Sequence, residues 1–289
     1  MRSEKEMLDL ILNVAKNDDN IRAVIMNGSR LNPNTKKDPF QDFDIVYFVR
    51  DVEPYKRNRE FIRPFGELMI VQTPDDMGDL APEDADQYAY LMQFLDGNRI
   101  DLSLCSLEKI SARIADSLTV VLLDKDGLIP ELPPPSDRDY LPQKPTSRQF
   151  DDCCNEFWWV STYVAKGLWR DELTYAKYML DVVVREELLK MLTWYVGTRT
   201  DFHKSPGKMG KYFRQFLTSE MWEQLQSTYT DWESEHTWDS LFAMGDLFRE
   251  TGQAVAKHFD FNYPEQDDKN VTSYLKHVRT LPQDTETIY

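Results

Sequence analysis

The 289-residue sequence contains few cysteines and histidines, and this scarcity excludes several kinds of site. There are three cysteines, an odd number, and Cys153 and Cys154 are adjacent in a segment with a helical pattern. This arrangement rules out a disulfide framework and argues against a zinc site. The four histidines show no His-x-x-x-His spacing. We therefore expect reduced cysteines and no metal site built on histidine.

Positive charge and long apolar runs are also scarce. Lysine and arginine number 34 against 50 acidic residues, which gives a net charge of −16. Nucleic-acid binding needs clustered positive charge, so no nucleic-acid partner is expected. The same charge would attract a polycationic small molecule, with solubility as the alternative role for the acidic residues. No apolar run approaches the ~20 residues of a membrane span, and the N-terminus lacks a signal-peptide pattern, so a cytoplasmic protein without a membrane partner is expected.

The first half of the chain has the pattern of a sheet with a covering helix. Apolar residues at helical spacing predict an amphipathic helix over residues 3–16. Asp96-Gly97-Asn98 predicts a hairpin turn between two strands. The acidic, turn-rich residues 73–87 predict a loop or flap, with disorder as the alternative. The expected strands cover residues 21–26, 42–49, 67–72, 88–94, 99–105 and 118–123.

The second half changes to a helical period after a proline-rich stretch that predicts a stiff linker. Thr146-Ser147-Arg148-Gln149 has the form of a capping box, and a second helix is expected from residue 173 to a C-cap at Gly197. Further helices are expected over 211–230 and 234–258. The sequence thus predicts an α+β fold: a mixed sheet with flanking helices, then an α-helical bundle. The expected domains are 1–135 and 146–262, followed by a weakly structured polar tail, 263–289.

The stretch from Asn27 to Phe48 carries the clearest functional pattern. Side chains alternate between the two faces of a strand, so Asp42 and Asp44 share one face of a predicted strand, about 6–7 Å apart. Two such carboxylates repel each other unless a cation or water separates them, and Mg²⁺ prefers carboxylate oxygens while leaving positions for phosphates. Solvated acids at a strand end are the alternative. Upstream, Gly28 permits a tight turn, and Ser29 offers a hydroxyl and a backbone N–H to a phosphate.

This pattern resembles the signature of the DNA polymerase β-type nucleotidyltransferases: Gly28-Ser29, a twelve-residue spacer, then Asp42-Phe43-Asp44-Ile45. That family places a third carboxylate on a later strand, and Asp101 fits this position. The chain resembles the aminoglycoside 6-adenylyltransferases more closely, over most of its length. The matching blocks are Asn27-Gly28-Ser29-Arg30, Phe40-Gln41-Asp42-Phe43-Asp44, Asp96-Gly97-Asn98, Val121-Leu122-Leu123-Asp124-Lys125-Asp126 and, most specifically, Phe150-Asp151-Asp152-Cys153-Cys154-Asn155-Glu156-Phe157-Trp158.

The resemblance implies a nucleotidyltransferase that transfers AMP from ATP to a hydroxyl of an aminoglycoside, foremost streptomycin, and releases pyrophosphate. It implies one or two Mg²⁺ ions held by Asp42, Asp44 and Asp101, which are also the expected catalytic residues. Asp101 would orient the acceptor hydroxyl or accept its proton. ATP and the acceptor are expected to meet between the two domains.

Further residues are candidates for ligand contacts, and the resemblance supplies the two lysines among them. Candidates for binding the nucleotide phosphates are Gly28, Ser29, Arg30, Lys208 and Lys211, with a solvated loop as the alternative for the two lysines. Candidates for binding the cationic acceptor through charge and an aromatic face are Asp152, Glu156 and Trp158, with the core of the bundle as the alternative place for the tryptophan.

Two alternative functions remain open. The same fold could serve another acceptor, such as a lincosamide, a protein or an RNA end, because the catalytic signature does not discriminate among them. The acidic composition counts against RNA. A non-catalytic nucleotide-binding module is the second alternative, and the presence of all three carboxylates argues against it.

Overall fold

The computed structural model describes residues 1–78 and 86–289. Contacts divide the chain into two compact units, Met1–Asp139 and Tyr140–Tyr289, which are described separately. The first contains a mixed sheet with helices and the second a helical bundle, so the predicted α+β fold class is confirmed. Within the loop expected over 73–87, Pro74–Asp76 form a 3₁₀ turn, and residues 79–85 lie outside the described residues.

The described part of the first unit contains a six-stranded sheet in the order β3-β4-β5-β2-β1-β6. Strands β2 and β5 are parallel, and every other neighbouring pair is antiparallel. Every predicted strand is present to within one residue at each end, and β4 and β5 form the predicted hairpin. The strands are β1 (Ile21–Asn27), β2 (Phe43–Val49), β3 (Leu68–Gln72), β4 (Gln87–Phe94), β5 (Arg99–Ser106) and β6 (Thr119–Asp124).

The alternation of side chains gives the sheet two unlike faces. One face packs against α1 (Glu4–Lys16) through Met7, Ile11 and Ala15, and it holds the larger core of this unit. Ser3 caps α1 in a capping box with Glu6. The other face carries a smaller core beside the short α3 (Ile110–Arg113). A second short helix, α2 (Arg59–Ile62), precedes β3.

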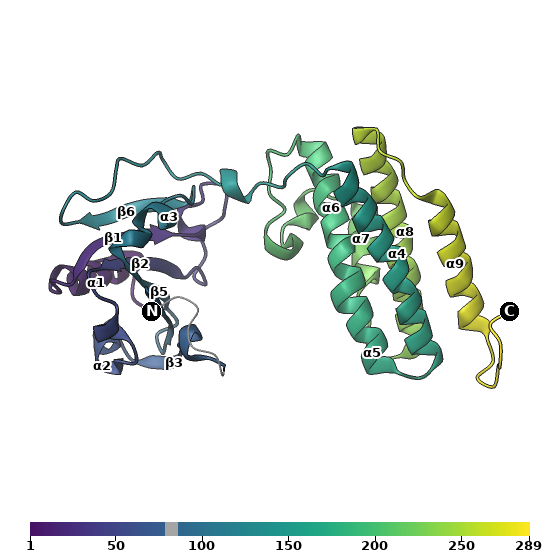
Figure 1. Ribbon diagram of the computed structural model, residues 1–289, viewed down its shortest axis with the longest axis horizontal. Helices are drawn as coiled ribbons and strands as arrows, with labels where there is room; N and C mark the ends of the chain where they lie inside the picture. The colour runs from purple at the N-terminus through teal and green to yellow at the C-terminus, as the bar shows by residue number, and fades with distance from the viewer. Residues whose placement is uncertain (79–85) are drawn as a thin grey trace. The chain divides into compact units, whose positions relative to one another are not determined.

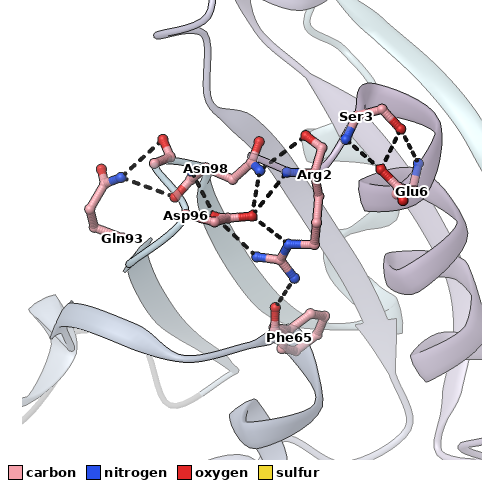
Figure 2. Close-up of polar contacts among 8 residues, drawn as sticks. Arg2, Ser3, Glu6, Phe65, Gln93, Asp96 and Asn98 are labelled. Carbon is pink, nitrogen blue, oxygen red and sulfur yellow. Dashed lines mark hydrogen bonds and ion pairs between the residues drawn. The ribbon is translucent and has the colours of Figure 1, made fainter.

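A polar network ties the start of the chain to the β4–β5 turn (Figure 2). The Arg2 side chain donates through Nε to Asp96 at 2.7 Å and through Nη1 to the carbonyl oxygen of Phe65 at 2.5 Å. The Asp96 carboxylate also accepts from the backbone and side chain of Asn98, at 3.0 and 2.9 Å. Asp96-Gly97-Asn98 therefore forms a structural turn, and it leads directly into β5.

The second unit is a bundle in which α4, α6, α8 and α9 run alongside one another (Figure 1). Thr146 caps α4 in the predicted capping box with Gln149. Within the described residues, no helix combines the length and apolar character needed to cross a membrane. The helices are α4 (Ser147–Trp169), α5 (Leu173–Tyr178), α6 (Arg185–Thr200), α7 (Ser219–Ser227), α8 (Ser234–Phe259) and α9 (Glu265–Thr280), with a π-helical turn, Met179–Val184, between α5 and α6.

Two predictions about helix ends are wrong. The second predicted helix does not stop at Gly197: α6 continues to Thr200 and ends at Asp201, which adopts the left-handed conformation with φ 48°. Gly197 is instead a packing position, because a Cβ there would lie 2.3 Å from the ring of Phe202. The helix expected over 211–230 is also shorter, since the side chain of Thr218 caps α7 and starts the helix there.

The prediction of a weakly structured polar tail over 263–289 is also wrong for most of that segment, because residues Glu265–Thr280 form α9. This helix is polar on average, but Leu275 and Val278 are buried, and Val271 and Tyr274 pack against the same core. These apolar residues recur at helical spacing and cover α4. Burial of this apolar stripe stabilises the helix although most of its other residues are polar.

Candidate functional site

Three carboxylates converge at the start of the two parallel strands. The register pairs Asp44 of β2 with Asp101 of β5, and Asp42 directly precedes β2 on the same face. One carboxylate oxygen from each of the three residues lies within 4.8 Å of the others. In the part of the chain that the structure describes, this is the only such grouping of potential metal ligands. The structure therefore brings together the three residues that the sequence singled out as catalytic and metal-binding.

Burial makes this cluster electrostatically unfavourable without a cation. The pKa of Asp44 is raised from 3.8 to about 6. Burial is the main cause, and the negative charges of Asp42 and Asp101 add to it. Arg99 and Arg30 act in the opposite direction. The donor set of three carboxylate oxygens suits a hard divalent cation such as Mg²⁺, which would offset the repulsion.

A guanidinium already lies against this cluster. Arg99, the first residue of β5, donates from Nε and Nη2 to the two carboxylate oxygens of Asp101, both at 2.7 Å. Its Nε also lies 3.5 Å from Oδ2 of Asp42. Arg99 was not among the predicted site residues, although its position two residues before Asp101 on a strand sets it on the same face. The contact shows that the carboxylates favour a positive charge at this place.

The Gly28-Ser29-Arg30 loop borders the triad, but its residues differ in role. Gly28 has φ 85° and ψ −164°, and a Cβ there would lie 1.9 Å from Oδ2 of Asp44. The backbone at Gly28 therefore lies directly against the Asp44 side chain. Ser29 begins a single 3₁₀ turn, Ser29–Leu31. Its contact with a phosphate stays a prediction.

Arg30 interacts with the protein's own loop. Its buried guanidinium donates to the carbonyl oxygens of Asp42 at 2.9 Å and Gln41 at 2.6 Å, and it stacks 3.7 Å from the ring centre of Phe43. Only 9% of this side chain is exposed. These contacts position the backbone at Asp42, and a contact of Arg30 with the phosphates stays a prediction.

The second unit contains a pocket of about 540 Å³ that includes two of the predicted acceptor contacts, Asp152 and Glu156. Glu187 also lines the pocket and is 8% exposed, and it accepts two hydrogen bonds of 2.7 Å from Nζ of Lys190. This volume is in the range of small-molecule sites. The other lining residues are Gln149, Cys153, Asn155 and Trp194. Glu187, Lys190 and Trp194 were missed, because only the helical contact of α4 with α6 brings them beside Glu156.

The remaining predicted contacts lie elsewhere in this unit. Trp158 is 2% exposed and packs edge-on against Phe157 and Phe248 in the core, so its ring face is not available to an acceptor. Its neighbour Trp159 is 58% exposed. Lys208 and Lys211 are exposed in the loop before α7, and their contact with the triphosphate stays a prediction. Cys153 and Cys154 are buried and form no disulfide, as expected.

Known proteins resemble this chain over nearly its whole length. The family model described as streptomycin adenylyltransferase matches residues 1–278. An aminoglycoside 6-adenylyltransferase from Campylobacter jejuni is 45% identical over 276 residues, which cover 95% of each chain. One from Bacillus subtilis (strain 168) is 42% identical over 280 residues, which cover 96% of this chain and 98% of the relative. A crystal structure of an aminoglycoside 6-adenyltransferase from Bacillus subtilis is 38% identical, covers 97% of this chain and 100% of its own, and gives a TM-score of 0.48.

The resemblance read from the sequence motifs is thereby confirmed over nearly the whole chain. The chain belongs to the streptomycin adenylyltransferase family, a family of nucleotidyltransferase enzymes.

Proposed function

We propose that this protein transfers AMP from ATP to a hydroxyl group of an aminoglycoside, with streptomycin as the first candidate, and releases pyrophosphate. The observation that carries the proposal is the convergence of Asp42, Asp44 and Asp101 to within 4.8 Å in a chain that belongs to this family. Because ATP is the proposed AMP donor, the proposed reaction would take place in the cytoplasm.

In the proposed reaction the acceptor oxygen attacks the α-phosphorus, and the bond from that phosphorus to the pyrophosphate group breaks. Asp42 and Asp44, together with Asp101, would hold one or two Mg²⁺ ions. Bound Mg²⁺ would supply positive charge against the charge that develops on the phosphates. Asp101 would orient the attacking hydroxyl or accept its proton. Gly28 and Ser29 lie beside Asp44 and would contact the phosphates.

The pocket of the second unit supports a cationic, hydroxyl-rich acceptor. Asp152, Glu156 and Glu187 supply three carboxylates against the single ammonium of Lys190. Gln149 and Asn155 add amide groups that can hydrogen-bond to hydroxyls. A pocket of this composition suits guanidinium and ammonium groups better than an anionic acceptor.

The test is pyrophosphate release from ATP and Mg²⁺ with streptomycin, kanamycin, lincomycin or no acceptor, using wild type and Asp101→Asn in parallel. We expect release that depends on streptomycin and falls by orders of magnitude in the variant. If lincomycin is the only acceptor that supports release, the proposed acceptor is wrong and the proposed reaction type stands. ATP binding without release on any acceptor would favour the non-catalytic alternative.

The metal requirement is tested in the same assay by removing divalent ions with EDTA and restoring them one at a time. Activity that persists in EDTA would contradict the metal-binding role proposed for the triad. Circular dichroism of Asp101→Asn is the control that the variant is folded.

A further inference from the structure

Arg99 joins the three carboxylates in a group of four charged side chains. The parallel register sets Asp44 opposite Asp101. Arg99 lies two residues before Asp101, and its Nε lies 3.5 Å from Oδ2 of Asp42, which lies two residues before Asp44. Three of the four side chains are carboxylates and the fourth is a guanidinium.

The guanidinium takes up oxygens that a metal ion would need. Both carboxylate oxygens of Asp101 accept hydrogen bonds from Arg99, and Oδ2 of Asp42 lies 3.5 Å from its Nε. A bidentate pair of this kind is the strongest geometry between arginine and a carboxylate. The same pair also ties up Asp101, the group proposed to accept the hydroxyl proton.

Arg99 also has room to leave. Its side chain is 44% exposed, compared with 20% for Asp101 and 30% for Asp42. A long side chain at the first residue of a strand can rotate outward without moving the backbone. An arginine released beside bound ATP would find phosphate oxygens, which match its planar fork as well as a carboxylate does.

We propose that Arg99 is an internal counter-cation that occupies the acidic site before substrate binds. It releases Asp42 and Asp101 when a divalent cation arrives and moves to the phosphates of the nucleotide. This inference rests on the proposed function, since it assumes that the metal and ATP bind at the triad. Its consequence is coupling: the divalent cation binds weakly alone, because it must displace Arg99, and more tightly when ATP offers Arg99 a new partner.

The test measures binding of Mn²⁺ to the full-length protein by electron paramagnetic resonance of free Mn²⁺, without and with ATP. Without nucleotide, Arg99→Gln should bind Mn²⁺ on the order of 10-fold more tightly than wild type, because the competing charge is gone. Arg99→Lys, which keeps the charge but loses the bidentate fork, should fall between the two. With ATP the advantage of Arg99→Gln should shrink or reverse.

Two controls separate this inference from the proposed function. Arg22→Gln removes the same charge from β1, where Arg22 pairs with Asp126, and should leave Mn²⁺ binding within about 2-fold. Asp44→Asn should abolish binding. Equal Mn²⁺ affinity of wild type and Arg99→Gln, with binding still lost in Asp44→Asn, would overturn the role of Arg99 and leave the metal site standing. Binding that is indifferent to Asp44→Asn would overturn both.

Discussion

Gly28 and Asp44 approach so closely that no side chain fits between them: a Cβ on Gly28 would lie 1.9 Å from Oδ2 of Asp44. The two residues are adjacent in space because β1 and β2 pair antiparallel, with Asn27 opposite Asp44. Asn27 in turn donates to the hydroxyl of Thr119 on β6 at 2.6 Å. The glycine therefore sets the position of a carboxylate of the proposed metal site as well as the course of the loop.

Gly28→Ala should inactivate the enzyme while leaving it folded. The new methyl group must displace either the loop or the Asp44 side chain, and a displacement of about 1 Å at a reacting centre costs about 100-fold in rate. We expect a loss of at least that size in pyrophosphate release. The matched control is Gly127→Ala, which also changes a glycine with positive φ, 67°, but has nothing within 4 Å of its Cβ position. It should lose about 1 kcal/mol of stability and keep its activity. Equal activity of the two variants would contradict the role given to Gly28.

Asp44→Asn should stabilise the metal-free protein although it abolishes AMP transfer. The pKa of Asp44 is raised to about 6 by burial and by its carboxylate neighbours. The charged form therefore costs folding free energy, and this cost is absent below about pH 4, grows as the pH rises through 6 and is complete at pH 8. In EDTA at pH 8 the unfolding free energy of the variant should exceed that of wild type by on the order of 2 kcal/mol, measured as a higher melting temperature. The difference should shrink at pH 5.

Asp101→Asn is the comparison for this experiment. Asp101 is paired with Arg99, so its removal leaves a guanidinium without its bidentate partner and should give no stabilisation. If Asp44→Asn melts no higher than wild type at pH 8 in EDTA, the repulsion inferred at the triad is wrong.

The three carboxylates could be predicted from the sequence because strand alternation groups two of them and the family resemblance supplies the third, Asp101. Asp42 and Asp44 are two residues apart, and any strand sets them on one face. The acceptor pocket could not be predicted in the same way. Glu187 and Trp194 lie on α6, more than thirty residues after Glu156 on α4, and only helix packing brings them together. Trp158 and Trp159 show the same limit: consecutive residues on a helix point in different directions, and only the packed bundle shows that Trp158 faces the core.

Asp96→Asn should destabilise the first unit in a pH-dependent way. Hydrogen bonds from Arg2, and then from Asn98, hold the pKa of Asp96 well below its usual range. The stabilisation is therefore present above about pH 4 and lost as the pH falls further, since protonation of Asp96 removes the ion pair. At pH 7 we expect the variant to lose about 1–2 kcal/mol of unfolding free energy, because the pair is partly buried. Asp9→Asn, which breaks an exposed pair with Lys5, should leave the melting temperature close to that of wild type. Equal melting of both variants at pH 7 would count against the network.

Glu187→Gln and Lys190→Met should shift aminoglycoside binding in opposite directions. Lys190 holds Glu187 with two hydrogen bonds of 2.7 Å, and Glu187 is 8% exposed at the pocket wall. Its carboxylate can pair with a substrate cation only in competition with that ammonium. Glu187→Gln removes the charge and should weaken streptomycin binding by about 10-fold or more. Lys190→Met leaves the carboxylate unpaired, which should lower the melting temperature of the free protein and increase the stabilisation that streptomycin provides.

Thermal shift at several streptomycin concentrations measures both effects, with Lys269→Met as the control. Lys269 forms an exposed pair with Glu265 on α9, so its loss removes one positive charge away from the pocket. It should leave the streptomycin-induced shift close to that of wild type. The opposite signs are the decisive feature, because general damage to the bundle would lower binding in both pocket variants. If Lys190→Met binds streptomycin more weakly than wild type, Lys190 itself contacts the acceptor and the proposed competition for Glu187 is wrong.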